Sequence, residues 1–274
     1  FPASPRPSFV ACPPGAGPAS EAEYARDLRL GDSCVVRLPS DWTVRSQGDR
    51  GTCVAHAAIA CTELTRFQMT DRIEPLSEQY VQYWIRRHQL ASGGLRGRAW
   101  LHEAGDILET QGVPTAASCP YNQFADEGGL DDCPPSGAAE AEAHARLFPT
   151  NVIDDAARQD KTTAQFLYWL LAHGVPAAIS FPIYRRPDPV RGGTNWTTPL
   201  ARSHGIVADP PWDFDPRPEN GTMAQGHAVC LAGFLRNPRV RGGGWFMFRN
   251  SWGLSWATEA GVSVQPYAIP ELPG

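Results

Sequence analysis

Apolar residues in the first half of the chain recur at the spacing of a helix face. Val54, Ala58 and Cys61 lie three or four residues apart, so the pattern predicts a long helix over 52–69. The same spacing predicts two further helices, over 76–89 with Ser77 as its N-cap and over 98–110. The first half of the chain is therefore predicted to be helical.

The second half of the chain changes character. One more helix is predicted over 161–172. Apolar, β-rich runs predict strands over 175–181 (bounded by Pro182), 227–234, 244–249 and 261–265, and the segment 183–224, rich in Pro, Gly, Asp and Asn, is predicted to form long loops. Helices followed by strands favour an α+β protein of two packed lobes with a cleft between them.

These patterns also suggest how the chain is divided. Residues 1–36 are rich in Pro, Ala and Gly at first and have no core of their own, so we interpret them as an N-terminal extension or the remnant of a pro-segment. Residues 37–274 form the predicted main domain, with a helical lobe at about 45–150 and a β-rich lobe at about 151–274. The chain starts at Phe1 without Met, so we expect it to be a processed or excised piece.

Composition and charge exclude several classes of function. With 274 residues, 42% apolar content and a formal charge of −5, the chain is typical of a globular protein, expected to be a monomer. No apolar run is long enough for a membrane span. The 24 Lys and Arg are scattered and outnumbered by 29 Asp and Glu, which argues against nucleic acid as a partner. Lys161 is the only lysine, and the excess of Arg, Ala and Pro hints at a GC-rich bacterial source.

The chain has seven cysteines, an odd number that fits one free thiol and up to three disulfides. Because Cys61 and Cys230 lie in apolar runs and could be core residues, the plausible bridges are Cys119–Cys133 and Cys12–Cys34. Disulfides would favour a secreted or extracytoplasmic protein; a cytoplasmic protein or a delivered effector is the alternative. Two matches to the glycosylation sequon, at Asn195 and Asn220, are treated as chance.

The stretch 46–60 carries the most informative chemistry. It places Gln47 six residues before Cys53, with glycines between them, and Cys53 opens the predicted buried helix. A helix N-terminus has partial positive charge and free N–H groups, which favour the thiolate form of a cysteine. The glycines allow backbone N–H groups to approach a bound group closely. Cys53 is therefore a candidate nucleophile, although a cysteine at a helix start is often only structural.

A nucleophilic cysteine needs a base and a group that orients the base. Of seven histidines, His227 stands out because it begins an apolar strand, where an imidazole can be held rigidly at the rim of a cleft. Downstream, the strand 244–249 leads into Asn250-Ser-Trp252-Gly. An Asn oxygen can accept the histidine N–H, and an adjacent Trp can shield that bond from water. Taken singly, Trp252 could be a core aromatic and Asn250 a turn residue.

Taken together, these motifs resemble the papain-like cysteine peptidase family. The order is Gln47 and Cys53, then Gly-His-Ala-Val at 226–229, then Asn-Ser-Trp-Gly at 250–253, and the resemblance spans about 38–266. It implies a helical left lobe and an antiparallel β-barrel-like right lobe. It also implies Cys53 as the nucleophile, His227 as general base and acid and Asn250 as its orienter, and Gln47 with the Cys53 N–H as the oxyanion hole.

The resemblance also implies how substrate is held. Gly93 and Gly94 would hydrogen-bond an extended peptide, Gly226 lies beside the base, and Trp252 would cover the bond between Asn250 and the base. A peptide or protein would be the partner, and no cofactor or metal is implied. The chain departs from the family at Arg50, which stands where a cysteine is usual, at Val54 in place of Trp, and at His56 in place of an aromatic. Insertions at 122–145 and 185–224 are expected to reshape the cleft.

Three functions fit this pattern. A thiol endopeptidase that hydrolyses peptide bonds through an acyl-enzyme is the leading hypothesis. An acyl-transferring or exo-acting relative, such as a transpeptidase or amidase, would use the same acyl-enzyme, and loops at 185–224 that block one end of the cleft would favour it. A non-catalytic binding module with the same fold is the third, and the presence of all four active-site residues argues against it.

Overall fold

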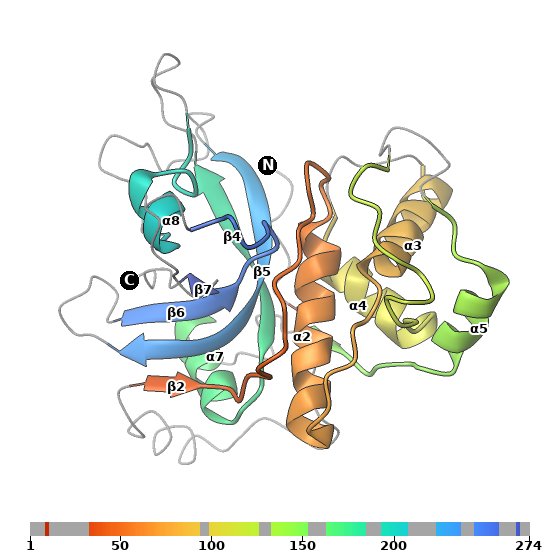
Figure 1. The fold of residues 1–274 in the computed structure, drawn as a ribbon, viewed down its shortest axis with the longest axis horizontal. Helices are drawn as coiled ribbons and strands as arrows, with labels where there is room; N and C mark the ends of the chain where they lie inside the picture. The colour runs from red at the N-terminus through yellow and green to blue at the C-terminus, as the bar shows by residue number, and fades with distance from the viewer. Residues whose placement is uncertain are drawn as a thin grey trace.

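The structure is a computed structural model that describes most of the chain. The described residues are 9–10, 33–93, 99–125, 133–152, 163–184, 193–207, 223–236, 244–257 and 267–268. In Figure 1 the sheet strands lie on one side of a central helix, together with α7 (Thr163–Ala172) and α8 (Pro199–His204), and the helices α3 (Glu78–Ala91), α4 (Leu101–Thr110) and α5 (Gly137–His144) lie on its other side. The helical and the β-rich parts therefore meet along that central helix.

The central helix is α2 (Cys53–Thr70), as the sequence predicted. Polar as well as apolar side chains of α2 are buried, including Glu63 at 1% exposure. A helix that is buried on nearly all faces is enclosed by other elements, and α2 contacts α3, α4, β4 and β5. It ends at Asp71, whose left-handed backbone lets its N–H bond to the carbonyl of Phe67.

The helices beyond α2 confirm two predictions and add an element. α3 (Glu78–Ala91) begins at the predicted N-cap Ser77, whose hydroxyl accepts from the Tyr80 N–H at 3.0 Å, and α4 (Leu101–Thr110) follows. α5 (Gly137–His144) lies inside a segment for which no element was predicted. It is only eight residues long and buries only two small side chains, Ala139 and Ala143, so its periodicity is weak.

The strands form an antiparallel sheet around β5 (Met223–Arg236). β5 pairs with β4 (Ala177–Tyr184), β6 (Gly244–Arg249) and β2 (Ser33–Val35), and β6 pairs with β7 (Tyr267–Ala268). The strands predicted at 175–181, 227–234 and 244–249 are confirmed, and 261–265 lies outside the described residues. β2 comes from the predicted N-terminal extension, so its residues 33–35 join the sheet.

The antiparallel, β-rich lobe is as predicted, and the described strands do not close it into a complete barrel. Among the described strands, β4 pairs only with β5 and β7 only with β6, so the ends of the sheet do not meet. Pro182 does not end β4 as predicted, because β4 continues to Tyr184. Proline is tolerated there because β4 has one partner strand, and the strand edge does not need every N–H.

The remaining elements flank the sheet. α7 (Thr163–Ala172) matches the helix predicted over 161–172 and contacts β2, β4 and β5. α8 (Pro199–His204) lies within the segment predicted as loop, and Thr198 caps it by accepting from the Ala201 N–H at 3.2 Å. β1 (Phe9–Val10) and β3 (Asn151–Val152) form a separate two-stranded sheet. No helix in the described part of the chain is long and apolar enough to cross a membrane.

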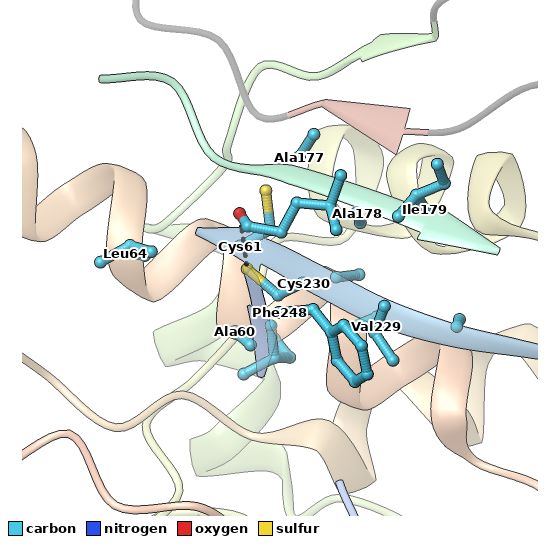
Figure 2. Packing of buried hydrophobic residues seen from close by; sticks show 14 of the residues in the cluster. Ala60, Cys61, Leu64, Ala177, Ala178, Ile179, Val229, Cys230 and Phe248 are labelled. Atoms are coloured by element: carbon cyan, nitrogen blue, oxygen red, sulfur yellow. Dashed lines mark hydrogen bonds between the residues drawn. The ribbon is translucent and has the colours of Figure 1, made fainter. Parts of the chain in front are cut away.

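The main core fills the contact between α2 and the sheet (Figure 2). Side chains of α2 pack against those of β4, β5 and β6, among them Ala60, Cys61, Leu64, Ala177, Ala178, Ile179, Val229, Cys230 and Phe248. Cys61 and Cys230 are fully buried core residues, one of the two possibilities that their apolar surroundings suggested. The core therefore holds α2 against β5, which carries His227, and against β6, which ends just before Asn250.

The described cysteines do not form the expected disulfides. Cys119 and Cys133 are both free thiols, which corrects the predicted Cys119–Cys133 bridge. Cys34 is also free and its thiol donates to the carbonyl of Leu171 at 3.2 Å, while its predicted partner Cys12 lies outside the described residues. A disulfide needs two closely placed, correctly directed Cβ atoms, and the spacing of cysteines along a sequence does not supply that geometry.

Candidate active site

Cys53 is the first residue of α2 and is half-buried. The side chain of the N-cap residue Thr52 does not cap the helix, because its hydroxyl bonds to the Tyr121 hydroxyl at 2.7 Å. The N–H groups of the first turn are therefore not taken up by the cap side chain. The positive end of the helix dipole lies at Cys53, as the sequence predicted.

Gln47 lies in a loop that is fastened to the segment after β6. Its backbone N–H donates to the Ser251 carbonyl at 2.8 Å, and its side-chain Oε1 accepts from the Ser251 hydroxyl at 2.5 Å. A β-bridge between Ser46 and Trp252 and a bond from the Gly253 N–H to the Arg45 carbonyl at 3.1 Å extend this contact. Segments about 200 residues apart in the sequence are thus held together at the site.

The amide of Gln47 is fixed at both ends. While Oε1 accepts from Ser251, one N–H of Nε2 donates to the Arg50 carbonyl at 2.6 Å. A side-chain amide nitrogen has two N–H groups, so this bond uses only one of them. Gly48 follows at a φ of 61°, and a Cβ there would lie 3.2 Å from the Gln123 side chain. Glycine therefore suits the tight turn that follows Gln47.

Arg50, which stands where the resembled family usually has a cysteine, connects its own loop to α3 and to the segment at 121–122. Its guanidinium donates to Gln79 Oε1 at 2.9 Å and to the Asn122 carbonyl at 2.7 Å, and it lies 5.0 Å from the centre of the Tyr121 ring. Arg50 is 5% exposed. Charge-assisted hydrogen bonds of this kind hold the loop between Gln47 and Cys53 in place.

His227 and Asn250 are brought together, as the sequence predicted. His227 lies on β5 and is 2% exposed, and its Nε2 is 2.7 Å from Asn250 Oδ1. The Ser251 N–H donates to the same Asn250 oxygen at 2.8 Å. Because that donor identifies the atom as oxygen, His227 Nε2 must carry the hydrogen, and Nδ1 is the nitrogen left for chemistry.

Two tryptophans enclose the His227 ring. The Trp252 ring centre lies 4.7 Å from that of His227 at an interplanar angle of 34°, and the Trp196 ring centre lies 4.8 Å away in a T-shaped arrangement. Burial lowers the pKa of His227 to about 4, while the bond to Asn250 acts in the opposite direction. The ring is therefore neutral at pH 7 unless an anion faces it.

Trp196 is the residue that the sequence analysis missed. It is 1% exposed, contacts Trp252, Trp256 and Phe248 as well as His227, and donates to the Pro182 carbonyl at 3.3 Å. It lies within the segment predicted as loop, where Asn195-Trp-Thr was noted only as a sequon match. A tryptophan and an asparagine in a Pro- and Gly-rich segment were the available signal.

Asn195 has a structural role in the turn before Trp196. Asn195 is 5% exposed, and its Oδ1 accepts from the Tyr184 N–H at 2.9 Å at the end of β4. The pairing is completed by the Asn195 N–H, which donates to the Tyr184 carbonyl at 3.2 Å. Asn195 therefore anchors the turn that presents Trp196 to His227.

The predicted substrate-binding residues have different outcomes. Gly93 is exposed just after α3, with open space where a Cβ would lie, and Gly94 lies outside the described residues. Gly226 pairs with Pro182 beside His227, and a Cβ there would lie 2.9 Å from the Ser180 hydroxyl. Gly226 is therefore explained by close packing, and substrate contact at these glycines stays a prediction.

Comparisons with known proteins agree with the fold. No protein-family model and no curated protein sequence matches the chain. Among solved structures, xylellain, a cysteine protease from Xylella fastidiosa, aligns over 97% of this chain and 90% of its own, with a TM-score of 0.63 and 19% identity. Bromelain from Ananas comosus aligns over 89% and 91%, with a TM-score of 0.50 and 18% identity.

A cysteine protease from Carica candamarcensis gives a similar result, with 89% of this chain and 91% of that chain aligned, a TM-score of 0.50 and 15% identity. Similarities at this level of identity concern the backbone, whereas the residues of the site rest on their own geometry. The chain has the fold of the papain-like cysteine proteases.

Proposed function

We propose that this chain is a cysteine peptidase, an endopeptidase in its main activity. Cys53 is the nucleophile, His227 the general base and acid, and Asn250 the residue that orients His227. The observation that carries the proposal is the 2.7 Å bond between His227 Nε2 and Asn250 Oδ1, under Trp252. That bond leaves Nδ1 as the reactive nitrogen in a fold used by cysteine proteases.

In this proposal the charge of the His227 ring depends on the Cys53 thiolate. Burial holds its pKa at about 4, so the imidazolium form at pH 7 requires a nearby anion. In our proposal that anion is the Cys53 thiolate, which the N-terminus of α2 also stabilises. Asn250 Oδ1 accepts the Nε2–H of the imidazolium and thereby stabilises it further.

The reaction follows from these roles. The Cys53 thiolate attacks the carbonyl carbon of a peptide bond, and the carbonyl oxygen becomes an oxyanion. The C–N bond then breaks as His227 gives its Nδ1 proton to the leaving amine, which forms a thioester on Cys53. Water attacks the thioester while neutral His227 takes its proton, and the acid leaves as thiolate and imidazolium are restored.

The oxyanion is served by two donors. These are the second N–H of Gln47 Nε2 and the backbone N–H of Cys53, at the start of α2. The bonds from Ser251 and to Arg50 hold the Gln47 amide before substrate arrives, so no reorganisation is required during the reaction. Preorganised donors of this type stabilise a transition state by about 3 to 4 kcal/mol each.

Two measurements test the proposal. A fluorogenic peptide with an internal cleavable bond should be hydrolysed by the wild type and not by Cys53→Ala. Iodoacetamide at near-neutral pH, followed by mass spectrometry, should label Cys53 at least about tenfold faster than ordinary thiols.

The matched control is Cys34→Ala, because Cys34 is also a half-buried free thiol, and burial raises its pKa. This variant should keep both the activity and the fast labelling. Labelling of Cys53 no faster than that of Cys34 would contradict an activated nucleophile. Release of terminal residues without internal cuts would instead favour the exo-acting alternative. The extracytoplasmic location stays a prediction, since the described cysteines are free.

A further inference from the structure

A second buried histidine lies close to the site, on the first turn of α2. His56 is 4% exposed, its Nδ1 is 3.1 Å from the Thr52 carbonyl, and its ring meets the edge of Tyr121 at 4.7 Å. A carbonyl oxygen can only accept, so Nδ1 carries the hydrogen of the neutral ring. His56 Nε2 is therefore an acceptor, and this buried atom has no hydrogen-bond partner among the described residues.

Asn250 has the complementary atom. Its Oδ1 accepts from His227 and from the Ser251 N–H. Its Nδ2, a donor with two N–H groups, is buried and has no partner in the part of the chain that the structure describes. Asn250 is 3% exposed. Nearly all buried polar groups in proteins are hydrogen-bonded, to protein or to ordered water, so one unpartnered donor and one unpartnered acceptor in the same place require an explanation.

Both residues line one small cavity beneath the site. The cavity has a volume of about 10 Å³, and Arg45, Glu78, Arg249 and Ser251 contribute to its polar wall. A space of about this volume can hold one water molecule when two or more polar groups surround it. The polar wall and the two unpartnered atoms satisfy that condition.

The other charged groups around this cavity are already paired. Arg45 bonds to the carboxylates of Glu63 and Glu78, and Arg249 bonds to the Thr43 carbonyl and lies 3.5 Å from Glu63. Each charged side chain that lines the cavity therefore already has a bonding partner. His56 Nε2 and Asn250 Nδ2 are the two groups in its wall that are buried without a partner in the described residues.

We propose that one water molecule in this cavity accepts a hydrogen bond from Asn250 Nδ2 and donates one to His56 Nε2, so that His56 is a positioning residue for the catalytic Asn250. The bridge holds the amide plane of Asn250 from the side opposite its bonds to His227 and Ser251. The effect of the bridge on catalysis rests on the proposed peptidase function. The bridge itself rests only on the two unpartnered atoms and the cavity that they line.

The bridge gives His56 a specific effect on the reaction. Without it, one end of the Asn250 amide is free, and the acceptor for the His227 imidazolium is less well fixed. That loss acts on the charged intermediates of the reaction and not on the binding of peptide, so kcat should fall while KM is unchanged. His56 itself touches no reacting atom.

A double-mutant cycle tests the coupling. His56→Phe keeps a ring of similar size but removes the acceptor, and it should lower kcat on the fluorogenic peptide about tenfold with KM unchanged. In an Asn250→Ala background the same substitution should change kcat less than about twofold, because the group through which it acts is gone. His56→Gln, which offers an acceptor oxygen, should restore most of the loss. Equal losses in the two backgrounds would overturn the bridge.

Nitrogen-15 NMR of the histidine rings tests the bridge without any need for activity. His56 should show the Nδ1–H tautomer, and its Nε2 signal should shift in Asn250→Ala, whereas the ring of His173 should not change. His173 is a matched control because its Nδ1 also bonds to a carbonyl four residues earlier, that of Trp169 at 2.7 Å.

The two tests separate the two proposals. An unchanged His56 Nε2 signal in Asn250→Ala overturns the bridge, whether or not the chain hydrolyses peptides. A shifted signal in a protein whose wild type hydrolyses no peptide supports the bridge and refutes the proposed function.

Discussion

Two buried histidines lie on either side of Asn250, and their surroundings give them different chemistry. His227 is enclosed by Trp252 and Trp196, and its Nε2 meets an oxygen that can accept from an imidazolium. His56 is placed near three arginines. Burial lowers the pKa of both rings, to about 4 for His227 and to about 3 for His56.

The two rings differ in whether they can carry a positive charge. A thiolate beside His227 can restore its positive charge, and Asn250 can then share that charge through a hydrogen bond. Arg45, Arg249 and Arg50 all disfavour a charged His56, so that ring stays neutral and can only accept at Nε2. Burial alone therefore does not make a histidine an acid or a base, whereas the charge and hydrogen-bonding capacity of its neighbours do.

The sharpest test of this comparison is to remove each ring in turn. His227→Ala should lower kcat by about 10³-fold or more, because it removes the group that we propose moves the proton. His56→Ala should lower it by about tenfold, since His56 acts only through Asn250. Steady-state hydrolysis of the fluorogenic peptide measures both. Comparable losses would mean that the base has been misassigned.

The next largest effect should come from the proposed oxyanion hole. Gln47→Ala removes one oxyanion donor and should lower kcat by about 10²- to 10³-fold. Ser251→Ala serves as the comparison, because it removes only the hydroxyl that holds Gln47 Oε1 at 2.5 Å, and it should cost much less. If the two variants lose equal activity, Gln47 acts through its contact with Ser251 and not as a hydrogen-bond donor to the oxyanion.

Much of the fold and of the site could be predicted from the sequence, because the responsible signals are local. The spacing of Val54, Ala58 and Cys61 reports the buried face of α2, and the apolar run 244–249 reports β6. Ser77 was recognised as an N-cap from its position alone. The pairing of His227 with Asn250 followed from two motifs whose order resembled that of a known family.

The rest depends on contacts between distant segments, which residue spacing does not report. Trp196 covers His227 because Asn195 anchors its turn to β4, and the Asn and Trp in that segment do not by themselves indicate which strand or ring they contact. The expected pairing of Cys119 with Cys133 failed for the same reason, since a count of cysteines contains no distances. Short helices such as α8 fall below the length at which periodicity is informative.

A smaller effect, on stability, tests whether His56 is kept neutral as the comparison requires. His56 has a pKa of about 3 in the folded protein and about 6.5 when unfolded, so below pH 6.5 the unfolded chain binds a proton that the folded protein refuses. The free energy of unfolding should therefore fall as the pH is lowered from 7 to 5, by about 2 kcal/mol from His56 alone.

Urea unfolding at pH 7 and pH 5 measures this contribution. His56→Phe should reduce the pH-dependent loss by about 2 kcal/mol, because the variant has no group to protonate at that position. His173→Phe removes an exposed histidine and should leave the loss at its wild-type size. A loss in His56→Phe equal to that of the wild type would mean that His56 accepts a proton in the folded state. The arginines would then not keep His56 neutral. His56 could act as an acid or a base as well, and the charge of the neighbouring groups would no longer favour His227 as the catalytic histidine.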